Sequence, residues 1–270
     1  MNISLLKKSN DFEKGSFCWS VNKLGKQNKC ISLRNIATGA LRDIGFVNGK
    51  WDTNAILEHA AGGVATAAVL YDVTNNKNNA YVSDSLQWQV TDGNVVPDWI
   101  ATYNIASGSY YYVVKPKSDR FTKNKLTVMS TFAIPAGTVV DNFLCSLAQI
   151  NTNVQWSLEF INGGTNKLYS YINTTSLNYG PFTLEETIRL STWKLDLSAS
   201  TSKLSREGQV DHDATPSHTM NGNNCWFVIG GRSSSTDTGA AYSGNRFRGR
   251  LKSLFITDKE VDTTKLGAKL

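Results

Sequence analysis

Acidic residues are the first candidates for chemistry in this sequence of 270 residues, because a pair of them can hydrolyse a glycosidic bond. The two carboxylates of such a pair must lie roughly 5–10 Å apart across a cleft. The candidates are Glu159, Glu185 and Glu186. Adjacent residues of a strand point to opposite faces, so Glu185 and Glu186 make a poor pair. We interpret all three as solvated loop carboxylates and predict no catalytic residue.

A second group of side chains is of the types that bind metal ions. Residues 211–213 (Asp-His-Asp) and His218 are suitable ligands, but they surround a polar stretch at 215–217 and show no ordered spacing. The cysteines at positions 18, 30, 145 and 225 include no C-x-x-C pair. The sequence also contains no nucleophile-elbow, phosphate-loop or dinucleotide motif. We therefore expect neither a metal nor a cofactor.

A third group is basic and alternates along one segment. Arg246, Arg248, Arg250 and Lys252 are spaced by two, so on a strand all four project from the same face. Two interpretations remain open for this face. It is either an outward, solvated strand surface or the contact surface for an acidic protein neighbour or an anionic glycan. Exposed tyrosines, such as some of those at 110–112, could stack on sugar rings, whereas most tyrosines are expected to pack in the core or at sheet edges.

Charge and hydropathy argue against two kinds of partner. The formal net charge of +6 is mild for this length and partly terminal, whereas nucleic-acid binding needs a clustered basic patch. The N-terminus has no long apolar run, and no segment approaches the roughly 18 apolar residues of a membrane span. We therefore expect no nucleic acid, no membrane insertion and no signal peptide. A cytoplasmic origin predicts reduced thiols, although Cys18 and Cys30 flank a predicted hairpin and could pair.

The elements that must position these residues are mostly strands. Seven Trp, ten Tyr and eleven Phe favour strands over helices. We expect a hairpin over 16–36, a helix over 53–61 with Asp52 as its cap, and a buried strand over 65–71. Strands follow one another from residue 80 to 257, with a bulge near 191–192, before a short helix at 262–268. We predict an all-β antiparallel sandwich that forms one domain over 16–270, after an N-terminal arm at 1–15.

The stretch from Asp43 to Ala80 carries a resemblance. It reads D-I-G-F-V-N-G at 43–49, D-T-N-A-I-L at 52–57 and Y-D-V-T-N-N-K-N-N-A at 71–80. It resembles the catalytic domain of fungal-type α-L-arabinofuranosidase B and a set of bacteriophage virion proteins that share its fold without evident enzymology. The closing segments, 227–232 and 247–256, look like those of a laminin-G-like domain. The resemblance implies a concanavalin-like (laminin-G-like) jelly-roll sandwich with one or two short helices.

The resemblance implies the fold but not the activity. Residues 73–75 (Val-Thr-Asn) stand where the pattern has Gln-Ser-Gly. The adjacent Cys-Cys pair of the arabinofuranosidase is missing, and no carboxylate matches its nucleophile or its acid. Because a fold does not imply a function, we predict a protein that is not an enzyme.

The leading expectation is a bacteriophage virion structural protein, either a head decoration protein or head fibre, or a tail-fibre component. It would be assembled in the host cytoplasm and would dock on neighbouring virion subunits, or on copies of itself, through its sheet edges and residues 1–15. One alternative is a carbohydrate-binding module that recognises a host surface glycan. A second is an arabinofuranosidase-like glycoside hydrolase. A cleft with paired carboxylates would favour the hydrolase, and an aromatic groove would favour the carbohydrate-binding module. The absence of both would favour the virion protein.

Overall fold

The computed structural model describes most of the chain. The described residues are 16–24, 27–74, 78–82, 87–99, 112–114, 124–134, 142–149, 154–161, 167–172, 175–179, 189–206, 209–215, 225–231, 247, 249–259 and 261–267. Residues 1–15, predicted to form an N-terminal arm, lie outside this set.

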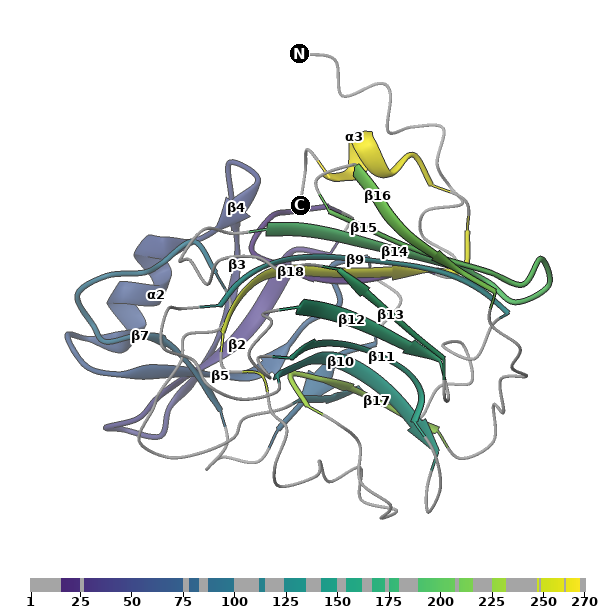
Figure 1. Ribbon diagram of the computed structural model, residues 1–270. Helices are drawn as coiled ribbons and strands as arrows, with labels where there is room; N and C mark the ends of the chain where they lie inside the picture. Colours follow the sequence, from purple (N-terminus) through teal and green to yellow (C-terminus); the bar gives the residue numbers. More distant parts are fainter. Residues whose placement is uncertain are drawn as a thin grey trace.

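The described strands form two antiparallel sheets (Figure 1). The first has the order β1 (Ser16–Ser20), β18 (Arg250–Thr257), β9 (Lys125–Ala133), β14 (Arg189–Asp196), β15 (Thr201–Arg206) and β16 (Gln209–Ala214). The second has the order β13 (Thr175–Tyr179), β12 (Lys167–Ile172), β11 (Val154–Ile161), β10 (Asn142–Gln149), β17 (Cys225–Ile229), β8 (Tyr112–Val114), β6 (Ala80–Tyr81), β5 (Ala65–Leu70), β2 (Lys29–Asn35), β3 (Leu41–Val47) and β4 (Lys50–Trp51). A further strand, β7 (Trp88–Thr91), pairs with β5.

The core lies between the two sheets and is rich in aromatic rings. Trp156 of β11 meets Trp193 of β14 with ring centroids 5.6 Å apart, and Trp19 of β1 stacks on Phe227 of β17 at 5.7 Å. Each pair joins one sheet to the other, and all four rings are at most 2% exposed. Large rings at alternate strand positions therefore hold the sandwich together. The all-β prediction is confirmed.

The stretch from Asp43 to Ala80, called the recognisable stretch below, lies at one end of the longer sheet. Helix α2 (Thr53–Ala60) begins at Asp52, whose side chain accepts a hydrogen bond from the backbone N–H of Ala55 at 3.0 Å. The helix ends at Ala61, which adopts a left-handed conformation before two glycines. Strand β5 follows with five of its six residues buried. The predicted helix and buried strand are both confirmed.

Two predictions of local structure are wrong. The hairpin over 16–36 does not form, because β1 pairs with β18 of one sheet while β2 pairs with β3 and β5 of the other. The bulge near 191–192 is absent too, since β14 pairs with β9 and β15 without a register shift. Ser191 points inward in phase with Trp193, and its hydroxyl is 2.6 Å from that of Ser130. A buried, hydrogen-bonded serine pair thus lies where the bulge was expected.

The C-terminal helix agrees with the sequence. Helix α3 (Thr263–Gly267) follows Asp262, which accepts a hydrogen bond from the backbone N–H of Thr264 at 3.2 Å. Its Leu266 is 6% exposed. Figure 1 shows α3 above the six-stranded sheet.

Candidate functional site

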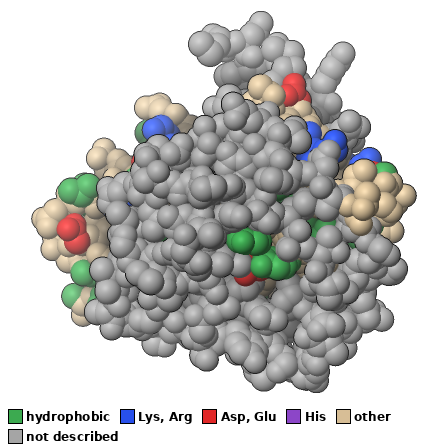
Figure 2. All heavy atoms as spheres, in the orientation of Figure 1, with side chains coloured by type: hydrophobic (Ala, Val, Ile, Leu, Met, Phe, Trp, Pro, Cys, Tyr) green, Lys and Arg blue, Asp and Glu red, His purple; other side chains and the backbone are tan. Residues whose placement is uncertain are grey.

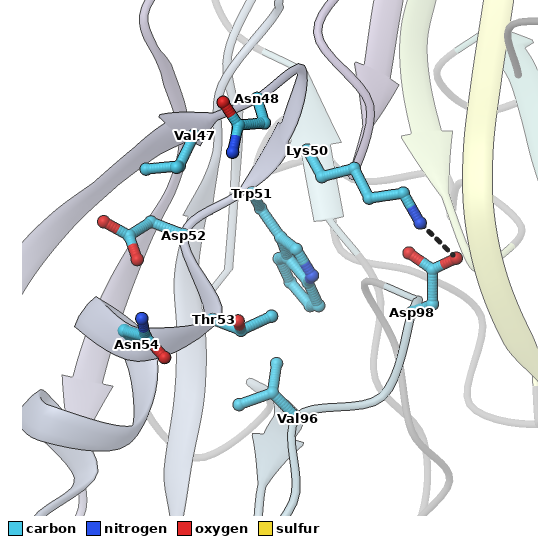
Figure 3. Close-up of a pocket in the computed structure, with 9 residues that line it drawn as sticks. All are labelled: Val47, Asn48, Lys50, Trp51, Asp52, Thr53, Asn54, Val96 and Asp98. Carbon is cyan, nitrogen blue, oxygen red and sulfur yellow. Dashed lines mark ion pairs between the residues drawn. The ribbon is translucent and has the colours of Figure 1, made fainter.

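A pocket of about 400 Å³ opens beside the recognisable stretch (Figure 3). It lies where the turn between β3 and β4, the start of α2 and the segment after β7 meet. Its lining combines three apolar side chains with amide, hydroxyl, carboxylate and ammonium groups. The lining residues are Val47, Asn48, Lys50, Trp51, Asp52, Thr53, Asn54, Val96 and Asp98. We refer to it as the Trp51 pocket.

The first wall is formed by a tight hairpin. Asn48 and Gly49 have φ angles of 51° and 82°, and Val47 pairs with Lys50 across them. A two-residue Asn-Gly loop with positive φ at both positions is the turn that best matches the twist of paired strands. This turn places Lys50 and Trp51 immediately before the helix cap. Trp51 is 3% exposed, and Figure 3 shows its indole between the two sides of the pocket.

The second wall is the segment at 92–99, which side-chain and backbone contacts hold in place. Asp92 accepts hydrogen bonds from the backbone N–H groups of Asn94 and Val95 at 2.9 and 3.3 Å. Thr91 donates its hydroxyl to the carbonyl of Val95 at 2.6 Å. Gly93 has a φ of 97°, and any side chain there would overlap the backbone of the two glycines after α2. This close approach fixes the wall against the end of the helix.

Asp98 connects this wall to the basic segment predicted from the sequence. Its Oδ2 lies 2.8 Å from Nζ of Lys252 and 3.6 Å from Nζ of Lys50. Next to it, the Arg250 guanidinium lies 4.2 Å from the centroid of the Trp99 ring. Four basic residues form this segment, which we call the basic stripe: Arg246, Arg248, Arg250 and Lys252. Its two described members, Arg250 and Lys252, are half-buried and contact the wall of the Trp51 pocket.

The other members of the stripe, Arg246 and Arg248, lie outside the described residues. The register of β18 with β9 shifts between Leu251 and Ser253, so Lys252 sits at an irregularity of the strand. Contact of this face with a partner or a glycan stays a prediction. What the structure adds is that Lys252 has an internal carboxylate partner.

The composition of the Trp51 pocket suits a polyhydroxylated ligand. Its amides at Asn48 and Asn54 can both donate and accept hydrogen bonds, and Asp98 can accept them. Val96 and the indole of Trp51 supply apolar surface. A mainly preformed concavity with a few convergent polar groups is the usual form of a small-molecule site. The arrangement can hold a ligand that has hydroxyl groups on its rim and carbon–hydrogen groups on its faces.

Glu159 is not the solvated loop carboxylate expected from the sequence. It lies in β11, is 7% exposed, and accepts a hydrogen bond from the hydroxyl of Ser157 at 2.9 Å. Its neighbour across the strands is Tyr169, which stacks on Tyr171 with ring centroids 5.7 Å apart.

A carboxylate pair is not formed by these strands. Among the described residues of β10–β13 and β17, Glu159 is the one acidic residue. Glu185 and Glu186 lie outside the described part of the chain. Within the described residues, this face therefore presents a single buried carboxylate beside two stacked tyrosines.

The residues of metal-binding type are only partly described by the structure. Residues 211–213 lie in strand β16 and not in a loop, whereas His218 is outside the described residues. No group of three or more His, Cys, Asp or Glu side chains that could hold a metal ion occurs in the part of the chain that the structure describes.

The cysteines that could have paired are free. Cys18 lies in β1 and Cys30 in β2, in different sheets, and both thiols are buried and free. Burial raises the pKa of Cys30 to about 12. Burial, with a smaller effect of the nearby Asp72 charge, raises the pKa of Cys18 well above its usual value. These thiols are neutral packing groups and not nucleophiles.

Sequence reasoning did not anticipate the Trp51 pocket. Asn48, Gly49 and Asp52 were explained by turn and cap chemistry, which is correct but incomplete. The Asn-Gly pair was the available signal, since it predicts a hairpin that projects the residues beside it. Asp98 is 46 positions beyond Asp52 in the sequence, and no local pattern places the two at one site.

No family model matches this sequence, and no curated protein matches it. Among solved structures, the fold is similar to an arabinofuranosidase complexed with arabinofuranosyl-α-1,2-xylobiose, with a TM-score of 0.62 and 10% identity. That match covers 94% of this chain and 61% of the arabinofuranosidase chain. A mutant Trypanosoma rangeli sialidase that displays trans-sialidase activity gives a TM-score of 0.51 at 11% identity, covering 74% and 30% of the two chains.

These similarities define the class of fold, a concanavalin-like β-sandwich of the kind found in carbohydrate-active proteins. The chain spans 61% of the length of the arabinofuranosidases that it matches. At such low identity the likeness concerns the fold alone. No helix in the described part of the chain is long and apolar enough to cross a membrane.

Proposed function

We propose that this protein is a non-catalytic carbohydrate-binding jelly roll that holds a sugar in the Trp51 pocket. The observation that carries the proposal is the lining of that pocket. Amide, carboxylate and hydroxyl groups converge there beside an indole and two valines, in a volume of about 400 Å³. The sandwich fold, which sugar-active proteins share, agrees with it.

The partners of the two pocket carboxylates support a binding role. Glycoside hydrolysis needs one carboxyl group that delivers a proton and one that acts as a base or nucleophile. Here Asp52 caps α2, and Asp98 is bridged by two lysines. Both carboxylates already have structural roles as acceptors, and both remain able to accept a further hydrogen bond from a sugar hydroxyl.

A glycan array followed by calorimetry on the best ligand tests the proposal. Asp98→Asn and Asn54→Ala should each weaken binding about tenfold, because a hydrogen bond to a charged or polar sugar-binding group contributes about 1–3 kcal/mol. The matched control is Glu58→Gln, which removes a carboxylate paired with Arg42 on the surface of α2, outside the pocket lining. Its affinity should equal that of the wild type.

Two results would contradict the proposal. A glycan array without hits would show that the protein does not bind the sugars tested. Equal affinities for Asp98→Asn and Glu58→Gln would show that the sugar does not bind in the Trp51 pocket. Release of arabinose from a nitrophenyl arabinofuranoside by the purified protein would show that the non-catalytic assignment is wrong.

A second candidate role, a bacteriophage virion component, is supported by the resemblance of residues 43–80 to virion proteins. We propose that in this role the jelly roll is displayed on the particle and docks on neighbouring virion proteins through residues 1–15 and its sheet edges. The chain would then co-sediment with assembled particles, and deletion of residues 1–15 would abolish incorporation without changing the thermal unfolding of the purified protein. Absence of the chain from purified particles would refute this role, which is compatible with sugar binding.

A further inference from the structure

A second pocket lies on the six-stranded sheet, formed by segments that are remote in sequence from Trp51. It has a volume of about 210 Å³ and lies where β9, β14 and β15 meet the segment after β18. Four lysines line it: Lys125, Lys194, Lys203 and Lys259. Figure 2 shows Lys and Arg side chains gathered at the upper right of the molecule, over the ends of β14 and β15.

The positions of the lysines concentrate positive charge. Lys194 and Lys203 lie directly opposite each other on β14 and β15, an arrangement of like charges that destabilises a sheet. Lys203 also lies opposite Asp213 in the register of β15 with β16. Lys259 adds a further ammonium group from the segment after β18, and all four lysines are exposed.

Asp196, the one carboxylate among the described residues of the pocket lining, already has its partners. Oδ1 of Asp196 accepts hydrogen bonds from the backbone N–H groups of Ser198 and Ala199, both at 3.1 Å. Oδ2 lies 3.2 Å from Nζ of Lys125. The hydrogen bond from Ala199 and then that from Lys125 lower the pKa of Asp196. Asp196 therefore neutralises Lys125, and among the described lining residues the other three lysines leave positive charge in excess.

We propose that this lysine pocket binds an oxyanion, specifically a sulfate or phosphate ester carried by an anionic polysaccharide. Lys194, Lys203 and Lys259 supply charged donors around the hollow, and Thr127 and Thr201 add hydroxyl groups at its lining. Such an occupant relieves the repulsion between the opposed lysines of β14 and β15. The described lining contains no aromatic side chain on which nucleobases could stack, so a polysaccharide fits better than a nucleic acid.

The inference goes beyond the proposed sugar site, because it concerns another pocket, another sheet and a charged ligand. The test uses calorimetry or biolayer interferometry of the full chain with dextran sulfate, dextran phosphate, neutral dextran and a single-stranded DNA oligonucleotide. Lys194→Gln/Lys203→Gln should lose about tenfold or more in affinity for the preferred ester, since charge-assisted hydrogen bonds contribute about 1.5–3 kcal/mol each. Binding should also weaken as salt is added.

The matched control is Lys23→Gln/Lys29→Gln, which removes the same net charge outside the lysine pocket. Its affinity for the preferred ester should stay within about twofold of that of the wild type. Equal losses in the two double variants would overturn the proposal, because the binding would then reflect net charge alone. Tighter binding to DNA than to either ester would overturn it as well. Asp98→Asn should leave dextran sulfate binding unchanged, so this proposal and the Trp51 pocket can fail independently.

Discussion

Two aspartates near the recognisable stretch, Asp72 and Asp98, have opposite surroundings. Asp72 is fully buried and accepts hydrogen bonds from Cys18, Thr74 and Asn78 through backbone and side-chain donors at 2.7–3.3 Å. Asp98 has a side chain that is 40% exposed and faces a pocket, with two lysines as its partners. Both are short acidic side chains that join distant segments, yet one is saturated and the other still accessible.

This difference assigns a structural role to Asp72 and a ligand-binding role to Asp98. A buried carboxylate is tolerated where several donors satisfy it, and Asp72 thereby joins Thr74 and Asn78 to Cys18 of β1. No capacity is left there for a ligand. Asp98 joins the segment at 92–99 to β18 and to β4 by partly exposed ion pairs, which contribute less to stability than a fully buried network. Its remaining acceptor capacity opens into the Trp51 pocket, so this is where we place binding.

The largest effect should come from Asp72→Ala. The variant leaves the backbone N–H groups of Cys18, Thr74 and Asn78 without their acceptor. Each unsatisfied buried donor costs about 1–3 kcal/mol, so the free energy of unfolding should fall by more than about 3 kcal/mol. Urea unfolding followed by tryptophan fluorescence measures it. A loss below about 1 kcal/mol would show that Asp72 is not the structural member of the comparison.

A smaller loss is expected for Gly93→Ala, which addresses the wall of the Trp51 pocket. The new side chain would overlap the backbone of Gly62 and Gly63 in addition to the strain of a φ of 97°. We expect a loss of about 1–3 kcal/mol in the free energy of unfolding, and weaker sugar binding because Val96 and Asp98 move.

Gly39→Ala is the matched control for Gly93→Ala. Gly39 has a φ of 73°, but no atom lies within 4 Å of the place that an added Cβ would occupy. Its substitution therefore carries the backbone strain without the overlap. The free energy of unfolding that Gly93→Ala loses beyond Gly39→Ala measures the cost of the close approach. Weaker sugar binding by Gly93→Ala than by Gly39→Ala measures its effect on the pocket. If both variants behave alike in urea and in calorimetry, the wall is not positioned by Gly93.

Asp98→Asn should change stability least among these positions. Its carboxylate is 40% exposed and its two lysine partners are partly exposed, so the free energy of unfolding should fall by only about 1 kcal/mol. Asp72→Asn makes the same chemical change at the buried site. The difference between the two variants in urea unfolding therefore measures the effect of the surroundings of each aspartate. A loss at Asp98 as large as that at Asp72 would remove the distinction between the two sites.

Local chemistry explains which parts of this arrangement the sequence could predict. Asp52, Ala61 and the glycines after it define α2 through capping, and the apolar run of β5 defines a buried strand, because both signals act over a few residues. The partner of β1 could not be read in this way. Cys18 and Trp19 look like half of a hairpin, but their partners, Phe255 and Leu254, come from the last strand. Pairing between chain ends depends on the whole topology, which no local pattern encodes.

The site was hidden for the same reason. Asp52 caps a helix that sequence reasoning placed correctly, yet the pocket exists only because the turn at Asn48 and the segment at 92–99 pack beside it. The basic stripe shows the converse. Alternation placed Arg250 and Lys252 on one face of a strand, but it could not show that Trp99 and Asp98 would cover that face.

The smallest effect concerns a third aspartate, Asp43, which lies between the two extremes. It is hydrogen-bonded to Tyr71 at 2.7 Å and to Lys29 at 2.6 Å, with a side chain that is 38% exposed. Burial, and then the hydrogen bond to Asp43, raises the pKa of Tyr71 to about 12. An unfolded tyrosine titrates near pH 10. The folded state therefore holds the proton more tightly, and this stabilisation is complete below about pH 10 and lost as the pH rises through about 12.

Tyr71→Phe lacks this titration and serves as the reference for it. The stability of the wild type relative to Tyr71→Phe should decrease between about pH 10 and about pH 12, measured by urea unfolding. In an Asp43→Asn background the same difference should depend less on pH, because the acceptor and its charge are gone. The change should be small, since both groups are partly exposed to solvent. A difference that stays constant over this range would show that Asp43 and Tyr71 are not coupled, and Asp43 would then resemble Asp98 more than Asp72.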